Sequence, residues 1–295
     1  MKADVFFILD SFDFSGQIEK LISNLTEASA LVKKMDSEKF IRFSKTSDFY
    51  DNAIDKLYGT NAVPEAGALA SLLYDGNMSK ARTRNLDSSE VIKLVNNTTP
   101  VEDNRWLCIY GELPVTVEIK DSLRNANNEN ELVAYSKHIV INNNLTSVEY
   151  ADAFEGIYRN LIFHPKYNDV SNIAGGCKNF INGIFEMFDT MNCYVPKDGD
   201  VKGDVDYIDR RIKFETCEEG GGKKKRNTEE KKLDFFFEID GDTKKYNCEY
   251  HCKLHYFDGQ HETGKRHAGN RMYFGFYKPT IGQNKFLIAH LGDHL

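Results

Sequence analysis

The octet CEYHCKLH, which begins at Cys248, holds two cysteines, two histidines and a lysine. Side chains along a β-strand point alternately to its two faces, so Cys248 and Cys252 would share one face, while His251, Lys253 and His255 would share the other. A tetrahedral zinc site needs ligands that converge on one point, and the chain contains no CxxC pair. We therefore expect no metal site here and expect the cysteines to be small core residues.

Two later segments carry basic side chains that a sheet would bring beside this octet. RMYFGFY opens with Arg271, and KFLIAHLGDHL contains His290. Antiparallel pairing of the three segments could place these side chains on one polar surface. The expected catalytic residues are His251, Lys253, Arg271 and His290, and the expected ligand-binding residues are His255 and His294. The alternative is a solvated sheet face with one buried, hydrogen-bonded histidine.

These residue types match the needs of RNA cleavage without a metal or another cofactor. The reaction requires a base for the 2′-hydroxyl, an acid for the leaving oxygen, and cations for the charge that develops on phosphorus. Neighbouring cations lower the pKa of a histidine, which keeps it neutral and able to accept a proton. A phosphate-binding protein would use the same side chains without turnover, so catalysis stays open at this point.

The C-terminal motifs also carry a resemblance. HxKL (His251, Lys253, Leu254), RxYF (from Arg271) and AHLGDHL (from Ala289) resemble the tail domain of uncharacterised bacterial proteins that accompany anti-phage and abortive-infection systems. The basic residues on central strands are also similar to those of mRNA-interferase toxins. The resemblance covers residues 205–295 and implies a role in phage defence or growth arrest. It fits equally a non-catalytic sensor, or a subunit that binds a partner protein of such a system.

A second kind of site is conceivable at the N-terminus. VFFILDSFDF places Asp10 directly after an apolar strand, with Asp13 following. A Mg²⁺-dependent nuclease similar to PIN domains would use an acid at this place, together with further acids at later strand ends. Asp51, Asp55 and Glu118 are the candidates for these further positions. Acids after a first strand also serve as ordinary turn and cap residues.

Composition narrows the protein class. The 295 residues are 41% hydrophobic and carry a formal charge of -7, which supports a globular core and argues against wholesale coating of nucleic acid or of an anionic membrane. The apolar run at the N-terminus is too short and too acidic for a signal peptide, and no later stretch is long enough for a transmembrane span. We expect a cytoplasmic protein whose six cysteines are reduced.

The hydrophobic periodicity predicts an α+β protein. We expect an N-terminal, mainly helical α/β domain at 1–195 and a C-terminal antiparallel sheet domain at 196–295 with a mobile loop at 218–232. The segment VPKDGDVKGD, which is rich in turn-forming residues, marks the boundary. Expected strands lie at 5–9, 40–43, 106–110, 115–119, 205–217, 233–239 and 245–256. Expected helices lie at 17–34, 48–58, 65–74, 146–162 and 177–192, and Thr146 and Glu149 have the spacing of a capping box.

Overall fold

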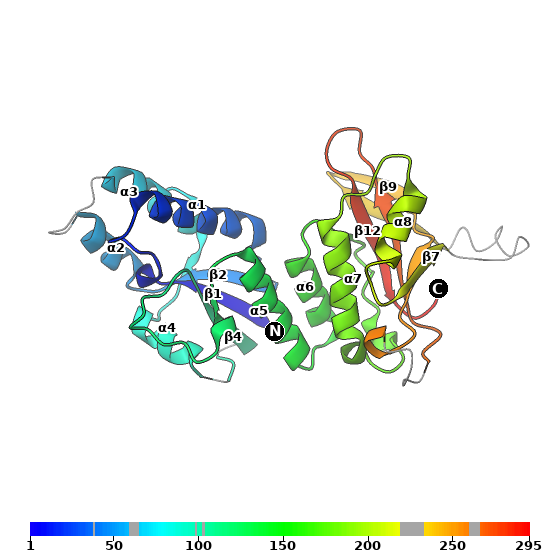
Figure 1. The fold of residues 1–295 in the computed structure, drawn as a ribbon, viewed down its shortest axis with the longest axis horizontal. Coiled ribbons are helices and arrows are strands. Elements are labelled where there is room, and N and C mark those ends of the chain that lie inside the picture. The colour runs from blue at the N-terminus through cyan, green and yellow to red at the C-terminus, as the bar shows by residue number, and fades with distance from the viewer. Residues whose placement is uncertain (38, 59–64, 98, 102–103, 219–232, 260–265) are drawn as a thin grey trace, which may run out of the picture. The chain divides into compact units, whose positions relative to one another are not determined.

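The computed structural model describes the chain except for residues 38, 59–64, 98, 102–103, 219–232 and 260–265 (Figure 1). It divides into two compact units, the N-terminal unit Met1–Asn143 and the C-terminal unit Asn144–Leu295. Helices and sheets occur in both units, and an antiparallel sheet lies in the second, so the predicted mixed class is confirmed. Among the described residues, none of the helices combines the length and the apolar character needed to cross a lipid bilayer.

The N-terminal unit is built on a parallel sheet in the order β3-β2-β1-β4-β5. Its strands are β1 (Lys2–Phe7), β2 (Ile41–Lys45), β3 (Arg82–Thr83), β4 (Arg105–Tyr110) and β5 (Asn125–Ala126). Its α-helices are α1 (Ile18–Met35), α2 (Phe49–Tyr58), α3 (Ala66–Tyr74), α4 (Ser88–Val95) and α5 (Glu129–Asn142), which lie on both faces of the sheet (Figure 1). The central strand β1 is accordingly buried in a continuous run from Ala3 to Phe7, as is usual for a parallel strand covered on both sides, and Asp4 is its one charged residue in that run.

Most elements predicted for this unit are confirmed within a few residues, including β1, β2, β4 and the first three helices. The strand expected at 115–119 is wrong. Residues 111–121 are turns and irregular backbone, and Val115 is fully exposed. The edge position beside β4 is taken by β5 instead, so the alternating apolar residues of this segment pair with no strand in the described part of the unit.

The C-terminal unit contains a five-stranded sheet in the order β6-β12-β11-β10-β7, antiparallel except for the β6–β12 pair. Its strands are β6 (Ile162–Phe163), β7 (Glu215–Glu218), β10 (Tyr250–Lys253), β11 (Arg271–Tyr277) and β12 (Lys285–Gly292). A separate hairpin is formed by β8 (Asp234–Ile239) and β9 (Asp242–Asn247). The helices are α6 (Ser147–Ile157), α7 (Ile181–Cys193) and α8 (Val201–Asp209), and the predicted capping box of Thr146 and Glu149 begins α6.

The division between the units falls after Asn143, whereas the change of sequence texture suggested 195. The reason is that α7 lies against the C-terminal sheet and α6 packs on α7, where the ring centroids of Phe154 and Phe188 lie 5.2 Å apart. Phe163 of β6 packs edge-on against Phe188 of α7, and Tyr194, just after α7, contacts Phe286 of β12. These helices therefore belong to the sheet that follows them in the chain.

Two strand predictions in this unit need correction. The segment 205–217 begins as α8 and becomes strand only at β7. The single strand expected at 245–256 is split: β9 pairs with β8 up to Asn247, and β10 starts at Tyr250 in a different sheet. The loop expected at 218–232 lies outside the described residues apart from Glu218, the last residue of β7.

Candidate functional site

The strand register brings the polar residues of the octet into line with those of both neighbouring strands. His251 of β10 lies opposite Cys217 of β7 on one side and Tyr273 of β11 on the other. Lys253 lies in the same way between Glu215 of β7 and Arg271 of β11. Because directly paired residues project to the same face, these six side chains share one face of the sheet.

The last strand adds His290 to the same face. It pairs with Tyr273, and Gly292 pairs with Arg271, while a bulge between Tyr273 and Phe274 shifts the register beyond this point. The predicted alignment of His251, Lys253, Arg271 and His290 on one surface is therefore confirmed as geometry, and their role in function stays a prediction. Cys252 projects to the other face, where its Sγ lies 3.3 Å from the Thr216 hydroxyl, so the predicted separation of this cysteine from His251 is also confirmed. Cys248 packs instead with Tyr273 and Leu287 on the face of His251, so the predicted common face of the two cysteines is wrong, because the strand is interrupted between Asn247 and Tyr250.

The β8–β9 hairpin and the residues that flank it cover one half of this face and leave the other half to the polar residues. Leu233, Phe237 and Cys248 pack with Leu287 and Ala289 of β12 in one buried apolar cluster, which also includes Tyr273. The hairpin segment thus covers the half of the face toward the β12 start, and the polar residues occupy the remaining half. Tyr273 belongs to this apolar cluster, and its ring centroid also lies 5.3 Å from that of His251 and 6.1 Å from that of His290.

His251 is held neutral by its surroundings. Its side chain is buried, and its Nε2 lies 3.4 Å from Cys217 Sγ. Burial lowers the pKa of His251 from 6.5 to about 4, and the positive charges of Arg271, Lys253 and His294 act in the same direction. At neutral pH the imidazole is therefore a proton acceptor in a positive electrostatic potential.

The residues next to His251 hold their positions through short contacts. Arg271 Nη1 lies 2.8 Å from His255 Nε2 and donates to the backbone carbonyl of Ala268 at 2.8 Å. Burial and the Arg271 charge lower the pKa of His255 to about 4 as well. Lys253 donates to the Glu215 carboxylate at 2.5 Å. We call His251, Lys253, His255 and Arg271 the cationic cluster.

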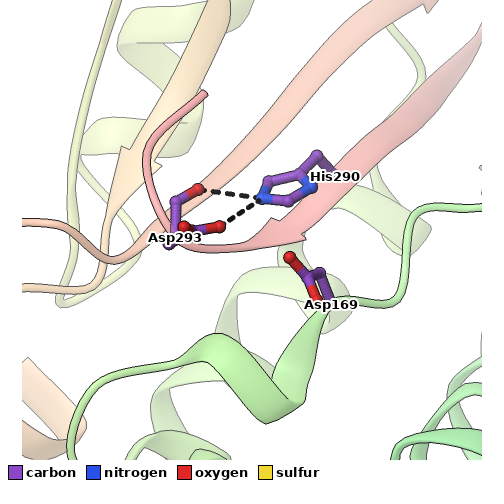
Figure 2. Close-up of side chains that lie close together, drawn as sticks. All are labelled: Asp169, His290 and Asp293. Carbon is purple, nitrogen blue, oxygen red and sulfur yellow. Dashed lines mark hydrogen bonds and ion pairs between the residues drawn. The ribbon is translucent and has the colours of Figure 1, made fainter.

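His290 lies in a different environment. Its Nε2 is 2.8 Å from the Asp293 backbone carbonyl and 3.9 Å from the Asp293 carboxylate, and the Asp169 carboxylate approaches it from the segment before the short helix η5 (Val170–Asn172) (Figure 2). His294 is exposed and meets the edge of the Tyr273 ring. The structure thus brings His251, Lys253 and Arg271 together, while His290 turns toward two acids.

Sequence reasoning missed four residues of this face. Cys217 and Glu215 belong to a strand that follows α8, and the expectation of one long strand at 205–217 hid their position. Tyr273 lies within the apolar segment RMYFGFY, where nothing distinguishes it from a core residue. Asp169 lies far from β12 in the sequence, and backbone pairing with the end of β12, including Asp169 N to the Leu291 carbonyl at 3.0 Å, brings it beside His290.

The acids proposed for an N-terminal magnesium site do not gather. Asp10 follows β1 as expected, in the short helix η1 (Leu9–Ser11), and is exposed, but Asp51 and Asp55 lie on α2, and Glu118 lies in the loop after β4. In the described part of this unit, no three His, Cys, Asp or Glu residues bring ligand atoms within 4.8 Å of one another.

A cavity of about 280 Å³ does lie at the carboxyl edge of the parallel sheet, where open sheets commonly bind ligands. Phe12 and Tyr110 contribute aromatic surface to it, and Lys20, Glu27 and Glu112 line it as well. Lys20 is ion-paired with Glu112 at 2.5 Å. The two carboxylates make this cavity unfavourable for a bare phosphate. Comparison with known proteins adds no family to these observations, because no family model matches the chain and no match is found among curated proteins or solved structures.

Proposed function

We propose that the C-terminal sheet binds RNA through its phosphodiester backbone at the cationic cluster and cleaves it without a metal. The observation that carries the proposal is the position of His251, a neutral imidazole with two cations, Lys253 and Arg271, on the same face of adjacent strands. Lys253 and Arg271 favour a phosphate near the imidazole, and His251 remains unprotonated at neutral pH.

In this proposal His251 accepts the proton of the ribose 2′-hydroxyl. The 2′-oxygen then attacks phosphorus, and the bond from phosphorus to the 5′-oxygen breaks. Arg271 and Lys253 stabilise the negative charge that develops on the phosphoryl oxygens, and the Lys253 ammonium gives a proton to the leaving 5′-oxygen. The products are a 2′,3′-cyclic phosphate and a free 5′-hydroxyl.

The remaining predicted residues take supporting roles. His255 contacts Arg271 directly at 2.8 Å and so fixes the position of the guanidinium. His294 stands at the exposed end of the face, where a following nucleotide could contact it. His290 shares the face but reaches toward Asp293, so we assign it no proton transfer in this mechanism.

The biological setting we propose is a cytoplasmic role in bacterial phage defence or growth arrest. The support for it is the resemblance of the HxKL, RxYF and AHLGDHL motifs to the tail domain of proteins that accompany anti-phage systems. The same cluster would also suit a sensor that binds RNA, or another phosphate-bearing ligand, and passes the signal to a partner protein. The two roles differ in turnover and not in the residues that bind.

The test measures cleavage of labelled RNA and DNA by the wild type, by His251→Ala and by His251→Gln, each in EDTA and in Mg²⁺. We expect cleavage of RNA alone, unaffected by EDTA, with a rate that falls by about 10²–10⁴ in both variants. Affinity for an RNA analogue without the 2′-hydroxyl should hardly change. His138→Ala, which alters a histidine of α5 in the other unit, is the matched control.

Three results would contradict parts of this proposal. Binding without cleavage would leave the face as a sensor or partner-binding site. Cleavage that needs Mg²⁺ and is indifferent to His251 would move the chemistry to Asp10 and the N-terminal unit. The absence of both binding and cleavage would exclude RNA as the ligand. Circular dichroism of each variant confirms that the buried substitution at His251 has not unfolded the sheet.

A further inference from the structure

A histidine and two aspartates meet at the end of β12. One ligand atom from each of Asp169, His290 and Asp293 lies within 4.8 Å of the other two (Figure 2). Within the described ranges of the chain, this is the one group of three or more His, Cys, Asp or Glu side chains with that property. We call it the Asp169–His290–Asp293 group.

The backbone around the group fixes its members in place. Asp169 N donates to the Leu291 carbonyl at 3.0 Å, and Leu291 N donates to the Tyr167 carbonyl at 2.7 Å, so the segment before η5 is paired to the end of β12. Asn172 donates its side-chain amide to the Asp169 carboxylate at 2.9 Å. The Asp169 carboxylate is therefore oriented by its neighbours before any ligand arrives.

Gly292 allows Asp169 and His290 to approach each other closely. A Cβ at this position would lie 2.8 Å from Asp169 Cβ and 2.9 Å from His290 Nε2, so any other residue would push the two apart. His290 itself is more than nine-tenths buried, and its Nε2 points toward Asp293. The group thus combines one buried nitrogen donor with oxygen donors.

The donor set indicates the class of ligand. His290 Nε2 faces the Asp293 carbonyl at 2.8 Å and the Asp293 carboxylate at 3.9 Å, with the Asp169 carboxylate on its other side. A cation that replaces the Nε2 proton would meet one imidazole nitrogen and several oxygens. Ca²⁺ and Mg²⁺ prefer sites made of oxygen alone, whereas an imidazole with carboxylates suits Zn²⁺ and Mn²⁺.

We propose that the Asp169–His290–Asp293 group binds a divalent first-row transition metal, Zn²⁺ or Mn²⁺. The ion joins the residues after β12 to the segment that precedes η5, and so ties the end of the chain to the body of the C-terminal unit. This site is independent of the proposed RNA cleavage, which uses the cationic cluster on the other side of Tyr273. The experiment below measures metal binding and fold stability and does not depend on any enzymatic activity.

The first measurement is calorimetric titration of untagged, chelator-treated full-length protein with ZnCl₂ and with MnCl₂. We expect one equivalent to bind and to raise the melting temperature, since an ion that binds only the folded state stabilises it. Asp169→Asn and Asp293→Asn should each weaken binding by at least about tenfold, because even the loss of a residue behind a ligand has an effect of this size. MgCl₂ and CaCl₂ should bind far more weakly.

The matched control is Asp242→Asn, which removes an exposed carboxylate of β9 in the same unit and should leave binding unchanged. Paramagnetic broadening by Mn²⁺ then locates the ion, and the amides of His290, Gly292 and Asp169 should broaden first. No uptake of either metal would overturn the proposal. Uptake that survives both aspartate variants, or broadening centred on other residues, would overturn it equally.

Discussion

Both units place charged side chains on their sheets, but they surround these charges differently. In the N-terminal unit, Asp4 of the central strand is buried, accepts a hydrogen bond from Ser44 at 2.6 Å and lies 3.6 Å from the Arg105 guanidinium. In the C-terminal unit, the charges that act on His251 are those of Arg271, Lys253 and His294, and all three lower its pKa. One arrangement is a buried pair of opposite charges. In the other, cations act on one buried imidazole, and Lys253 among them is also paired with the exposed Glu215.

The difference separates a structural role from a binding role. A buried carboxylate beside a guanidinium is enclosed by the fold and out of reach of a ligand, so removing one partner acts on stability. Cations gathered on one face raise the local potential, and a phosphate that approaches this face is attracted by it. The comparison predicts that substitutions in the first arrangement change stability and that substitutions in the second change ligand binding.

The largest expected effect is in the N-terminal unit. Asp4→Ala removes one partner of a buried pair and leaves Arg105 buried without that carboxylate, which should lower the free energy of unfolding by about 3–5 kcal/mol. Trp106, the single tryptophan, lies in β4 next to Arg105, so its fluorescence during urea denaturation reports on this unit. Asp55→Ala, an exposed acid of α2, is the control. If Asp4→Ala lowers the free energy of unfolding by less than about 1 kcal/mol, the pair does not contribute to stability as proposed.

The second effect concerns a buried cation of the same unit, Lys45. Its ammonium donates to Tyr50 Oη at 2.7 Å and to the Ser79 carbonyl at 2.8 Å, and burial lowers the pKa of Lys45 from 10.5 to about 8. Below about pH 8 the lysine is charged in both folded and unfolded chains, and the cost of burying the charge is present. As pH rises toward 10.5, the folded lysine loses its proton first, so the free energy of unfolding should increase.

The gain should reach at most about 3 kcal/mol. It is measured as the difference between wild type and Lys45→Met in urea denaturation, followed by Trp106 fluorescence from pH 7.5 to 10.5. The subtraction cancels groups that titrate in both proteins. If the difference does not change with pH, the buried ammonium is not destabilised by its surroundings, and the contrast with the paired charges of Asp4 and Arg105 fails.

The third prediction moves to the cationic cluster and separates charge from shape. Arg271→Gln removes a positive charge beside His251, so the pKa of His251 should rise from about 4 toward 6.5, while Arg271→Lys should hold it low. A pH titration of the His251 ring resonances measures both. The Gln variant should also bind RNA about tenfold more weakly, since a hydrogen bond to a charged group contributes about 1.5–3 kcal/mol.

Arg211→Gln is the control for this prediction, because Arg211 is an exposed cation of the same unit that stacks on Tyr207 away from the cluster. A His251 pKa that is unmoved by Arg271→Gln would show that burial alone sets it. RNA affinity that falls equally in the control would indicate a diffuse effect of net charge. Either result would indicate that the charges of the C-terminal unit contribute to the fold, as those of the N-terminal unit do, and do not form a specific binding site.

Local periodicity was enough to predict the common face of this cluster. The alternation of His251 and Lys253 within the octet, with Arg271 at the start of the next strand, places them correctly because side chains on strands repeat every second residue. The turn between β8 and β9 carries a sequence signal, but it lies before the expected strand at 245–256 and does not mark the break between Asn247 and Tyr250. Asp240 and Gly241 both have positive φ, 54° and 82°, and an Asp-Gly pair of this kind makes a tight hairpin turn.

Features that depend on distant parts of the chain could not be found this way. The unit boundary after Asn143 depends on which sheet the aromatic residues of α6 and α7 cover, and amphipathic periodicity does not say which partner a helix has. The approach of Asp169 to His290 depends on the pairing of Asn168 with Leu291, a contact between an irregular segment and a strand end. Such a contact leaves no periodic trace in either segment.

The smallest expected effect compares two ion pairs directly. Glu215 and Lys253 lie 2.5 Å apart, closer than Asp4 and Arg105, but the Glu215 side chain is 59% exposed whereas that of Asp4 is 1% exposed. Water and salt screen an exposed pair, so Glu215→Gln should change the free energy of unfolding by less than about 1 kcal/mol. The same variant frees the Lys253 ammonium for a phosphate, and RNA affinity at low salt should therefore rise slightly. If Glu215→Gln were as destabilising as Asp4→Ala, the short distance between the charges would matter more than their burial. The cationic cluster would then have a structural role and not a binding role.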